Sequence, residues 1–142
     1  DVLGRFLNMG VEAYQFVSAL NCVLAQRLVR TICSHCKRPA KVTRALLEES
    51  GLDPALEQTQ TFYEGIGCIE CGSTGYKGRT AICELLDLTD HIREMILEKR
   101  PTSEIKKAAR DEGMRFLRES AVERVLEGVT TLREINKVTF VE

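Results

Sequence analysis

The amino-acid sequence predicts a predominantly helical α+β fold, in which a tetracysteine metal module with short strands precedes a C-terminal helical subdomain. Two observations lead to this prediction. Two C-x-x-C pairs, Cys33–Cys36 and Cys68–Cys71, flank a short insertion, and helical periodicity with capping signals dominates the C-terminal part of the chain. We expect three segments: a helix and a strand in residues 1–32, the metal module in 33–82 and the helical subdomain in 83–142.

The bulk composition is that of a globular protein and excludes several classes. The 142 residues are 44% hydrophobic and 29% charged, with a net charge of −1, so the basic excess of a general nucleic-acid binder is missing. No apolar run approaches a membrane span, and the N-terminus lacks the pattern of a signal peptide. Because the sequence starts at Asp1 inside a helical pattern, we expect a fragment of a longer protein. Six cysteines without a secretory signal favour a reducing compartment.

The residues before the first cysteine pair predict a helix and then a strand. Apolar side chains recur at spacings of three and four from Tyr14 to Leu28, which favours a helix over this range. From Arg27 to Ile32 the residues alternate in a way that is typical of a short strand. The strand would deliver the chain directly into the first C-x-x-C pair.

Between and after the pairs, the pattern predicts short elements separated by turns. Thr43 is a plausible N-cap for a short helix that ends near Gly51. Thr61 to Glu64 reads as a short strand, and Arg79 to Leu88 reads as a longer one. Glycines between these two strands keep the second cysteine pair in a turn-rich segment.

The C-terminal part predicts a series of capped helices. Thr89 caps the first helix, which Pro101 ends, and further helices span Ser103–Glu112 and Met114–Glu127. Thr131 and Glu134 match a capping box, in which the threonine accepts from a backbone N–H and the glutamate reaches back. We expect one separate core from the apolar residues of these helices, namely Ile92, Ile96, Leu117, Val125 and Leu126.

The four paired cysteines predict a structural zinc site. A two-residue gap lets a tight turn aim both sulfurs at one centre, and two such turns supply the tetrahedral set of thiolates that Zn²⁺ takes. Iron in the same cage is the main chemical competitor. Four protein ligands leave no open coordination position, so the ligands Cys33, Cys36, Cys68 and Cys71 predict a structural metal and not a catalytic one.

The remaining cysteines and the histidines have no partner pattern for catalysis. Cys22 and Cys83 each stand alone in an apolar segment, so we expect both to be buried as small hydrophobes. His35 lies inside the first knuckle and His91 follows a helix cap, and we expect both at the surface. No catalytic residue is assigned.

Several ordered motifs resemble the type II secretion ATPases and the type IV pilus extension ATPases. They are Leu24-Ala-Gln-Arg-Leu-Val-Arg30 before the first cysteine pair, Thr74-Gly75-Tyr76-Lys77-Gly78-Arg79 after the second, and Gly128-Val129-Thr130-Thr131-Leu132 near the end. The resemblance covers nearly the whole chain. It implies a homohexameric ATP-driven motor in the cytoplasm, on the inner face of the inner membrane, that moves a membrane platform. Residues 1–32 would then end the ATPase core.

The resemblance assigns ATP and Mg²⁺ to the parent protein only. The family's phosphate-binding loop lies upstream, and no G-x-x-x-x-G-K-[ST] occurs in this sequence. We therefore expect the fragment alone to be inactive as an ATPase. Arg27 and Arg30 are candidates for nucleotide contact in the parent, where the core would run into this region. The alternative is that they form ion pairs that fix the strand.

Other functions remain open on the sequence alone. A zinc-ribbon module for nucleic acid or protein could use the basic cluster Lys37, Arg38, Lys41 and Arg44, although a solvated face explains that cluster given the near-neutral total charge. A chaperone-type zinc module would need glycines at other offsets, and a zinc hydrolase would need an open metal position. We expect no nucleic-acid partner. The sequence leaves secretion and pilus assembly undecided. It suggests a zinc clamp that projects a rigid lobe from the motor.

Overall fold

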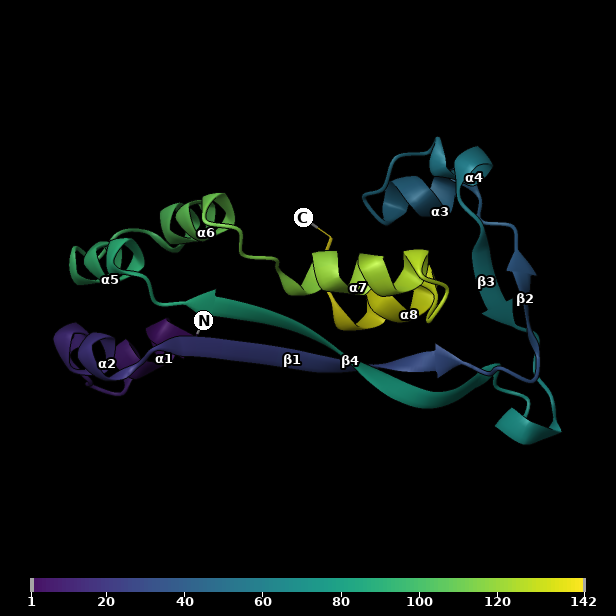
Figure 1. The fold of residues 1–142 in the computed structure, drawn as a ribbon, viewed down its shortest axis with the longest axis horizontal. Coiled ribbons are helices and arrows are strands. Elements are labelled where there is room, and N and C mark those ends of the chain that lie inside the picture. The colour runs from purple at the N-terminus through teal and green to yellow at the C-terminus, as the bar shows by residue number, and fades with distance from the viewer. Residues whose placement is uncertain (1, 142) are drawn as a thin grey trace. The chain divides into compact units, whose positions relative to one another are not determined.

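The computed structural model describes residues 2–141 as short helices and two antiparallel strand pairs (Figure 1). The helices are α1 (Val2–Asn8), α2 (Ala13–Ala19), α3 (Arg44–Glu49), α4 (Leu56–Thr59), the 3₁₀ helix η1 (Ile69–Cys71), α5 (Asp90–Leu97), α6 (Thr102–Asp111), α7 (Leu117–Leu126) and α8 (Leu132–Val138). The strands are β1 (Cys22–Ile32), β2 (Lys37–Ala40), β3 (Phe62–Gly65) and β4 (Tyr76–Asp87). The α+β class predicted from the sequence is confirmed. None of the described helices is long and apolar enough to cross a membrane.

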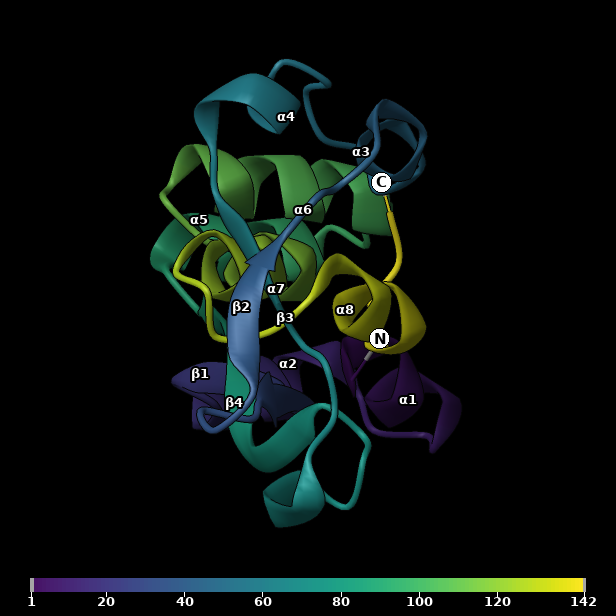
Figure 2. The ribbon, with the colours of Figure 1, turned by 90° about the vertical axis from the view of Figure 1, so that its right-hand side faces the viewer.

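Each strand pair brings distant parts of the sequence together. β1 pairs with β4, and their arrows run in opposite directions (Figure 1). β2 pairs antiparallel with β3, in a register that sets Lys37 opposite Gly65 and Ala40 opposite Phe62. Figure 2 shows that α3 and α4 lie at one end of the β2–β3 ribbon, and the cysteine turns follow from its other end. The insertion between the cysteine pairs is therefore this ribbon with its two helices.

The chain divides into two compact units by its contacts. Unit 1 comprises residues 1–25 and 84–116, and unit 2 comprises 26–83 and 117–142. β1 and β4 thus contribute residues to both units. The three segments expected from the sequence, 1–32, 33–82 and 83–142, stay a prediction.

Unit 1 has a small helical core. Its buried side chains come from α2, α5 and α6 and from the end of β4, and they are Ala13, Phe16, Val17, Leu88, Ile92, Met95, Ile96 and Ala109. Arg93 on α5 adds a polar link, since its guanidinium donates to the carbonyls of Val17 and Leu88. The apolar stripe of α5 and the backbone at the end of α2 are held together in this way.

Unit 2 has a second core that combines strands with the last two helices. Its buried side chains are Val29, Leu47, Phe62, Ile82, Ala121, Val125, Leu132 and Ile135. The insertion helix α3 is also fixed by a polar contact, because Arg118 of α7 donates to the carbonyl of its C-cap Ser50 at 2.6 Å. Arg118 also donates to Thr139 Oγ1 at 3.0 Å, just beyond α8. Burial lowers the pKa of Arg118, and these two acceptors bind two of its five N–H donors.

The structure corrects the prediction that the C-terminal helices share one core. Ile92 and Ile96 belong to the core of unit 1, Leu117 and Val125 belong to that of unit 2, and Leu126 is exposed. The helical pattern predicted the packed positions Ile92, Ile96, Leu117 and Val125 correctly but not Leu126. It did not reveal which partner each face packs against, because that depends on contacts with β1 and β4.

The predicted helix from Tyr14 to Leu28 is wrong in its second half. α2 ends at Ala19, Leu20 adopts extended backbone angles, and β1 begins at Cys22. Apolar residues such as Val23 and Leu24 fit a helical spacing over a short window, but pairing with β4 determines the conformation here. The predicted strand at Arg27–Ile32 is confirmed as the second half of β1.

The two lone cysteines are exposed, which contradicts the expected burial. Cys22 starts β1, and Cys83 follows Ile82 in β4. Ile82 is fully buried, and successive residues of a strand point to opposite faces. Ile82 and Cys83 therefore cannot both occupy the apolar side of β4.

Three predicted helix caps are present. The hydroxyls of Thr43, Thr89 and Thr131 accept from the backbone N–H three residues ahead, at 3.2, 3.3 and 3.1 Å. The expected reciprocal half of the last capping box is not observed, because the carboxylate of Glu134 binds Arg30 instead.

The alternation along β4 makes a direct prediction for two neighbouring residues. Ile82→Ala should lower the free energy of unfolding by about 2–5 kcal/mol, since it removes buried methyl groups and leaves a cavity. Cys83→Ala should change it by less than about 0.5 kcal/mol, because that side chain is exposed. Urea unfolding of the three proteins, followed by circular dichroism, measures both values. Equal losses would show that β4 does not present Ile82 to the core.

Candidate metal centre

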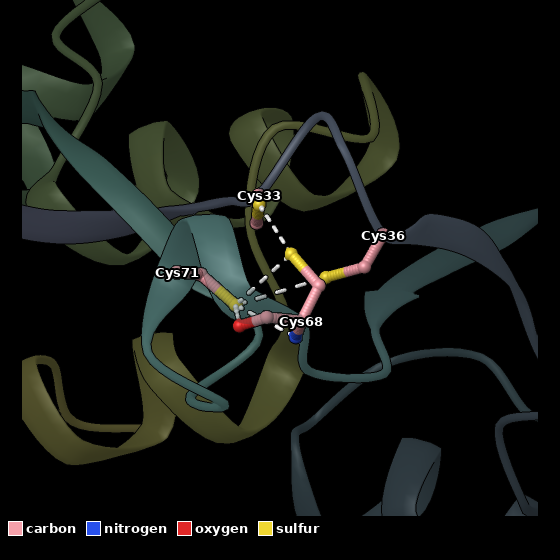
Figure 3. Close-up of side chains that lie close together, drawn as sticks. All are labelled: Cys33, Cys36, Cys68 and Cys71. Carbon is pink, nitrogen blue, oxygen red and sulfur yellow. Dashed lines mark hydrogen bonds between the residues drawn. The ribbon is translucent and has the colours of Figure 1, made fainter.

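Two turns bring the four paired cysteines to one place (Figure 3). Cys33 and Cys36 lie in the turn between β1 and β2, while Cys68 and Cys71 bracket η1 after β3. Cys33 is fully buried and Cys36 is nearly so. The sequence prediction that these residues converge agrees with this geometry.

The sulfur atoms are spaced as a tetrahedral metal site requires. All four lie within 4.8 Å of one another. The Sγ atoms of Cys33 and Cys68 are 3.8 Å apart, those of Cys36 and Cys71 are 3.9 Å apart, and those within the second pair are 3.7 Å apart. A tetrahedron with zinc–sulfur bonds of roughly 2.3 Å has edges of about 3.8 Å. The donor set and its spacing therefore fit Zn²⁺, and all four tetrahedral positions are filled by protein.

Backbone amides favour the thiolate form of one cysteine. Cys71 Sγ accepts from the N–H of Cys68 at 3.3 Å and from that of Gly75 at 3.2 Å. Burial opposes ionisation, but these donors outweigh it and lower the pKa of Cys71 to about 6. Burial raises the pKa of Cys36 to about 11, with the neighbouring thiols contributing in the same direction. Four thiolates packed this closely need a cation between them.

A close backbone contact closes the turn of the second cysteine pair, and a hydrogen bond links this turn to the first. A Cβ atom at Gly65 would lie 2.0 Å from the carbonyl oxygen of Gly75, and one at Gly75 would lie 2.3 Å from that of Gly65. Gly75 also has a φ of +81°, which disfavours a side chain. The carbonyl of Gly75 accepts from the N–H of Cys33 at 2.9 Å. The segments that carry the two cysteine pairs therefore touch directly through their main chains.

Arg30 is held by the Glu134 carboxylate and by the Tyr76 ring, both of unit 2. Its Nε and Nη2 atoms donate to the Glu134 carboxylate at 3.1 and 3.0 Å, and its backbone N–H donates to the same group at 2.7 Å. Its guanidinium also lies 4.2 Å from the centre of the Tyr76 ring. The sequence left two roles open for Arg30, nucleotide contact and an ion pair that fixes the strand. The structure contains the ion pair, with Glu134 as the partner.

The loop between α7 and α8 also forms hydrogen bonds to Arg30 and to residues near it. The Tyr76 hydroxyl lies 2.6 Å from Thr131 Oγ1, and the Thr130 hydroxyl donates to the carbonyl of Arg30 at 2.7 Å. The N–H of Ile32 donates to the carbonyl of Val129 at 2.9 Å. The residues just before Cys33 and just after the second cysteine pair are thus both bonded to residues 129–134.

The other candidate residues lie away from the cage. Arg27 is exposed, and its guanidinium donates to the neighbouring carbonyl of Gln26 at 2.9 Å. Its nucleotide contact stays a prediction. His35 and His91 are exposed, as expected, and within residues 2–141 the group that could hold a metal ion consists of the four cysteines without either histidine.

Sequence reasoning missed three residues that shape this site. Gly65 and Gly75 were read as turn formers, although their role is the backbone contact that a side chain would prevent. Glu134 was read as half of a capping box. Its spacing from Thr131 suggested that role, and no local signal pointed to Arg30, which lies 104 residues earlier.

Comparison with known proteins places this geometry in context. The family model described as "Type II/IV secretion system protein" matches residues 1–137. The type IV pilus assembly ATPase PilB of Thermus thermophilus is 47% identical over 135 residues, which are 95% of this chain and 15% of that protein. PilB of Pseudomonas aeruginosa is 39% identical over 98% of this chain and 24% of its own length. The type II secretion system protein E of Pseudomonas aeruginosa is 40% identical over 95% and 26%. The chain spans about a quarter or less of the length of these relatives.

The glycine contact predicts a strong effect of one methyl group. Gly65→Ala should open the turn that carries Cys68 and Cys71, because the new Cβ would overlap the Gly75 carbonyl, and should lower both metal retention and melting temperature. Gly4→Ala is the matched control, since nothing lies within 4 Å of a Cβ there and alanine favours the helix by up to about 1 kcal/mol. Zinc analysis and thermal unfolding give the two readouts. A Gly65→Ala protein with normal zinc and stability would contradict this account of the contact.

The Arg30–Glu134 pair predicts a pH-dependent contribution to stability. Burial alone would raise the pKa of Glu134, but the hydrogen bonds and charge of Arg30 lower it. Because the folded pKa lies below the unfolded value of about 4.3, the pair stabilises the fold above that value. This stabilisation is lost as the pH falls through the lowered folded pKa. We expect Glu134→Gln to cost about 1.5–3 kcal/mol at pH 7, with the difference from wild type shrinking below about pH 4.

Urea unfolding of both proteins across this pH range measures the difference. Glu64→Gln is the control, because the carboxylate of Glu64 pairs with Arg38 at 3.1 Å while 43% exposed, and exposed pairs contribute about 0–1 kcal/mol. A Glu134→Gln deficit that stays constant with pH would rule out ionisation of Glu134 as its source.

Proposed function

Because this chain belongs to the type II/IV secretion system protein family, we propose that it is the zinc-binding C-terminal part of a motor ATPase. The parent protein would act as a homohexamer on the cytoplasmic side of the inner membrane, where it would drive a secretion or pilus-assembly platform. Relatives that are named type IV pilus assembly ATPases and type II secretion proteins support this class of function. ATP and Mg²⁺ would bind in the parent, upstream of this segment.

The sulfur spacing of the cage is the observation that carries the proposal. Cys33, Cys36, Cys68 and Cys71 would hold one Zn²⁺, and the ion would supply four bonds that cross-link two turns. Because no coordination position would stay open, the ion would not activate water or substrate. The chain's own residues would do the rest: Gly65 and Gly75 allow the turn of Cys68 and Cys71 to close, and backbone amides favour the thiolate of Cys71.

We further propose that the cage works as a clamp between the strands and the C-terminal helices. Arg30 precedes the first cysteine pair, Tyr76 follows the second, and both are bonded to residues of the 129–134 segment. A clamp of this kind would keep unit 2 rigid, so that it can pass a push from the ATPase core to a partner. A flexible loop in its place would dissipate that push. Nucleotide contact by Arg27 in the parent remains part of the proposal, and contact by Arg30 would require release of Glu134.

The test uses the full-length parent protein with Cys68→Ser. We expect it to lose zinc, to keep hexamers and appreciable ATP hydrolysis, and to fail in secretion or pilus assembly. Cys83→Ser is the matched control, because that cysteine is exposed and lies outside the cage. Zinc content, hexamer mass, ATPase rate and transport are measured on the same strains.

Each possible result of this experiment tests a different part of the proposal. Normal transport with proven loss of zinc would make the clamp dispensable. Loss of hexamers would make zinc a requirement for folding and not for coupling. Wild-type protein that is purified without chelators and carries no metal would remove the proposed role of the cysteines altogether.

A further inference from the structure

A cavity that the metal centre does not use lies within unit 2. It has a volume of about 280 Å³ and is lined by residues of the β2–β3 ribbon, of the turn before α3, and of the start of α8. Its apolar lining includes Val42, Leu46, Phe62 and Leu132, and none of the four cysteines takes part. Gly65, Tyr76 and Thr131, which flank the cysteine cage, also line the cavity, so it adjoins the proposed zinc clamp without sharing its ligands.

Two cations at this cavity have no acidic partner. Lys41 and Arg133 line it and are exposed, and neither forms an ion pair with a residue of the described span 2–141. The acidic lining residue Glu64 is bound to Arg38. The charge that this cavity offers to a ligand is thus positive, and it sits beside apolar walls.

The sequence had already marked part of this surface as a basic cluster. The structure divides that cluster: Lys37 lies 4.6 Å from the centre of the Tyr63 ring and Arg38 is held by Glu64. Lys41 is the member of the cluster that lines the cavity. A single nucleic-acid strand would need a continuous groove of available cations and exposed aromatic faces, and this arrangement does not provide one.

The size of the cavity restricts the ligand further. Sites for drug-sized molecules and cofactors occupy about 300–1,000 Å³, so this cavity is too small for a dinucleotide and suits one or two side chains. Apolar walls suit an aromatic or aliphatic side chain, and the flanking cations suit carboxylates next to it. We propose that the cavity binds an acidic segment of a partner protein, with one aromatic side chain seated against Val42 and Leu46, the partly exposed apolar residues of its lining. The inference does not depend on the proposed role of zinc.

The test measures binding of labelled peptides to the 142-residue chain by fluorescence anisotropy. The probe is an eight-residue peptide with a central phenylalanine flanked by glutamates. One control peptide replaces the phenylalanine with serine, another replaces the glutamates with lysines, and a poly-dT oligonucleotide represents nucleic acid. We expect the acidic aromatic peptide to bind more tightly than all three, and more weakly as salt is raised.

Three protein variants locate the site. Reversing both cations, Lys41→Glu with Arg133→Glu, should weaken binding by about tenfold or more. Arg44→Glu reverses a charge of the same basic cluster outside the cavity and should change binding by less than about twofold. Val42→Phe should fill the cavity and weaken binding with the charge unchanged. Circular dichroism and zinc content verify that each variant is folded.

The binding results alone test the proposal, and no transport assay is needed. Absence of peptide binding at millimolar concentration, equal binding of the serine peptide, or insensitivity to the double charge reversal would each overturn it. Tighter binding of the oligonucleotide that requires Lys41 and Arg133 would overturn it in favour of a nucleic-acid site. If Val42→Phe does not fold, the charge-reversal pair and its Arg44→Glu control still decide.

Discussion

The approach of Gly65 to Gly75 is the constraint on which the metal centre depends. Two main chains can come this close only where neither carries a Cβ, and the contact occurs between the end of β3 and the start of β4. It closes the turn of Cys68 and Cys71, and the N–H of Cys33 joins the first turn to it by donating to the Gly75 carbonyl. A tetrahedral arrangement of four sulfurs follows from this backbone geometry as much as from the spacing of the cysteines.

The same contact fixes the surroundings of the cage. Tyr76 directly follows Gly75, so its ring and hydroxyl are positioned toward Arg30 and Thr131. Arg30 in turn is held by a carboxylate that is only 7% exposed. An ion pair of this kind is costly to bury unless it is well paired, and Glu134 meets the condition by accepting both the guanidinium and a backbone N–H. Metal ligands, strand ends and the last helix are therefore linked by short, directional contacts.

The sequence predicted the features of this fold that depend on local chemistry. The cysteine cage, the threonine caps and the strands at residues 27–32 and 61–64 have signals within a few residues, and the structure contains them. Features that depend on distant partners were missed or misread. The region 22–28 was read as a helix because its pairing with β4 leaves no trace in a short window. Cys83 was expected to be buried because hydrophobicity alone does not say which face of a strand meets the core. Glu134 satisfied a local motif while its partner lay elsewhere in the chain.

The Arg30–Glu134 contact joins residues that are 104 positions apart, and this has a consequence for biosynthesis. Unit 2 receives its part of β1 well before α8 and cannot complete its core until α8 has left the ribosome. In the meantime Val29 and Ile82 lack the helices that cover them. A chain that stops before Leu132 would leave these residues uncovered, and long-range contacts of this kind form slowly even in complete chains. The nascent chain would thus depend on α8 to cover exposed apolar surface, which makes products that stop before α8 targets for chaperones and proteases.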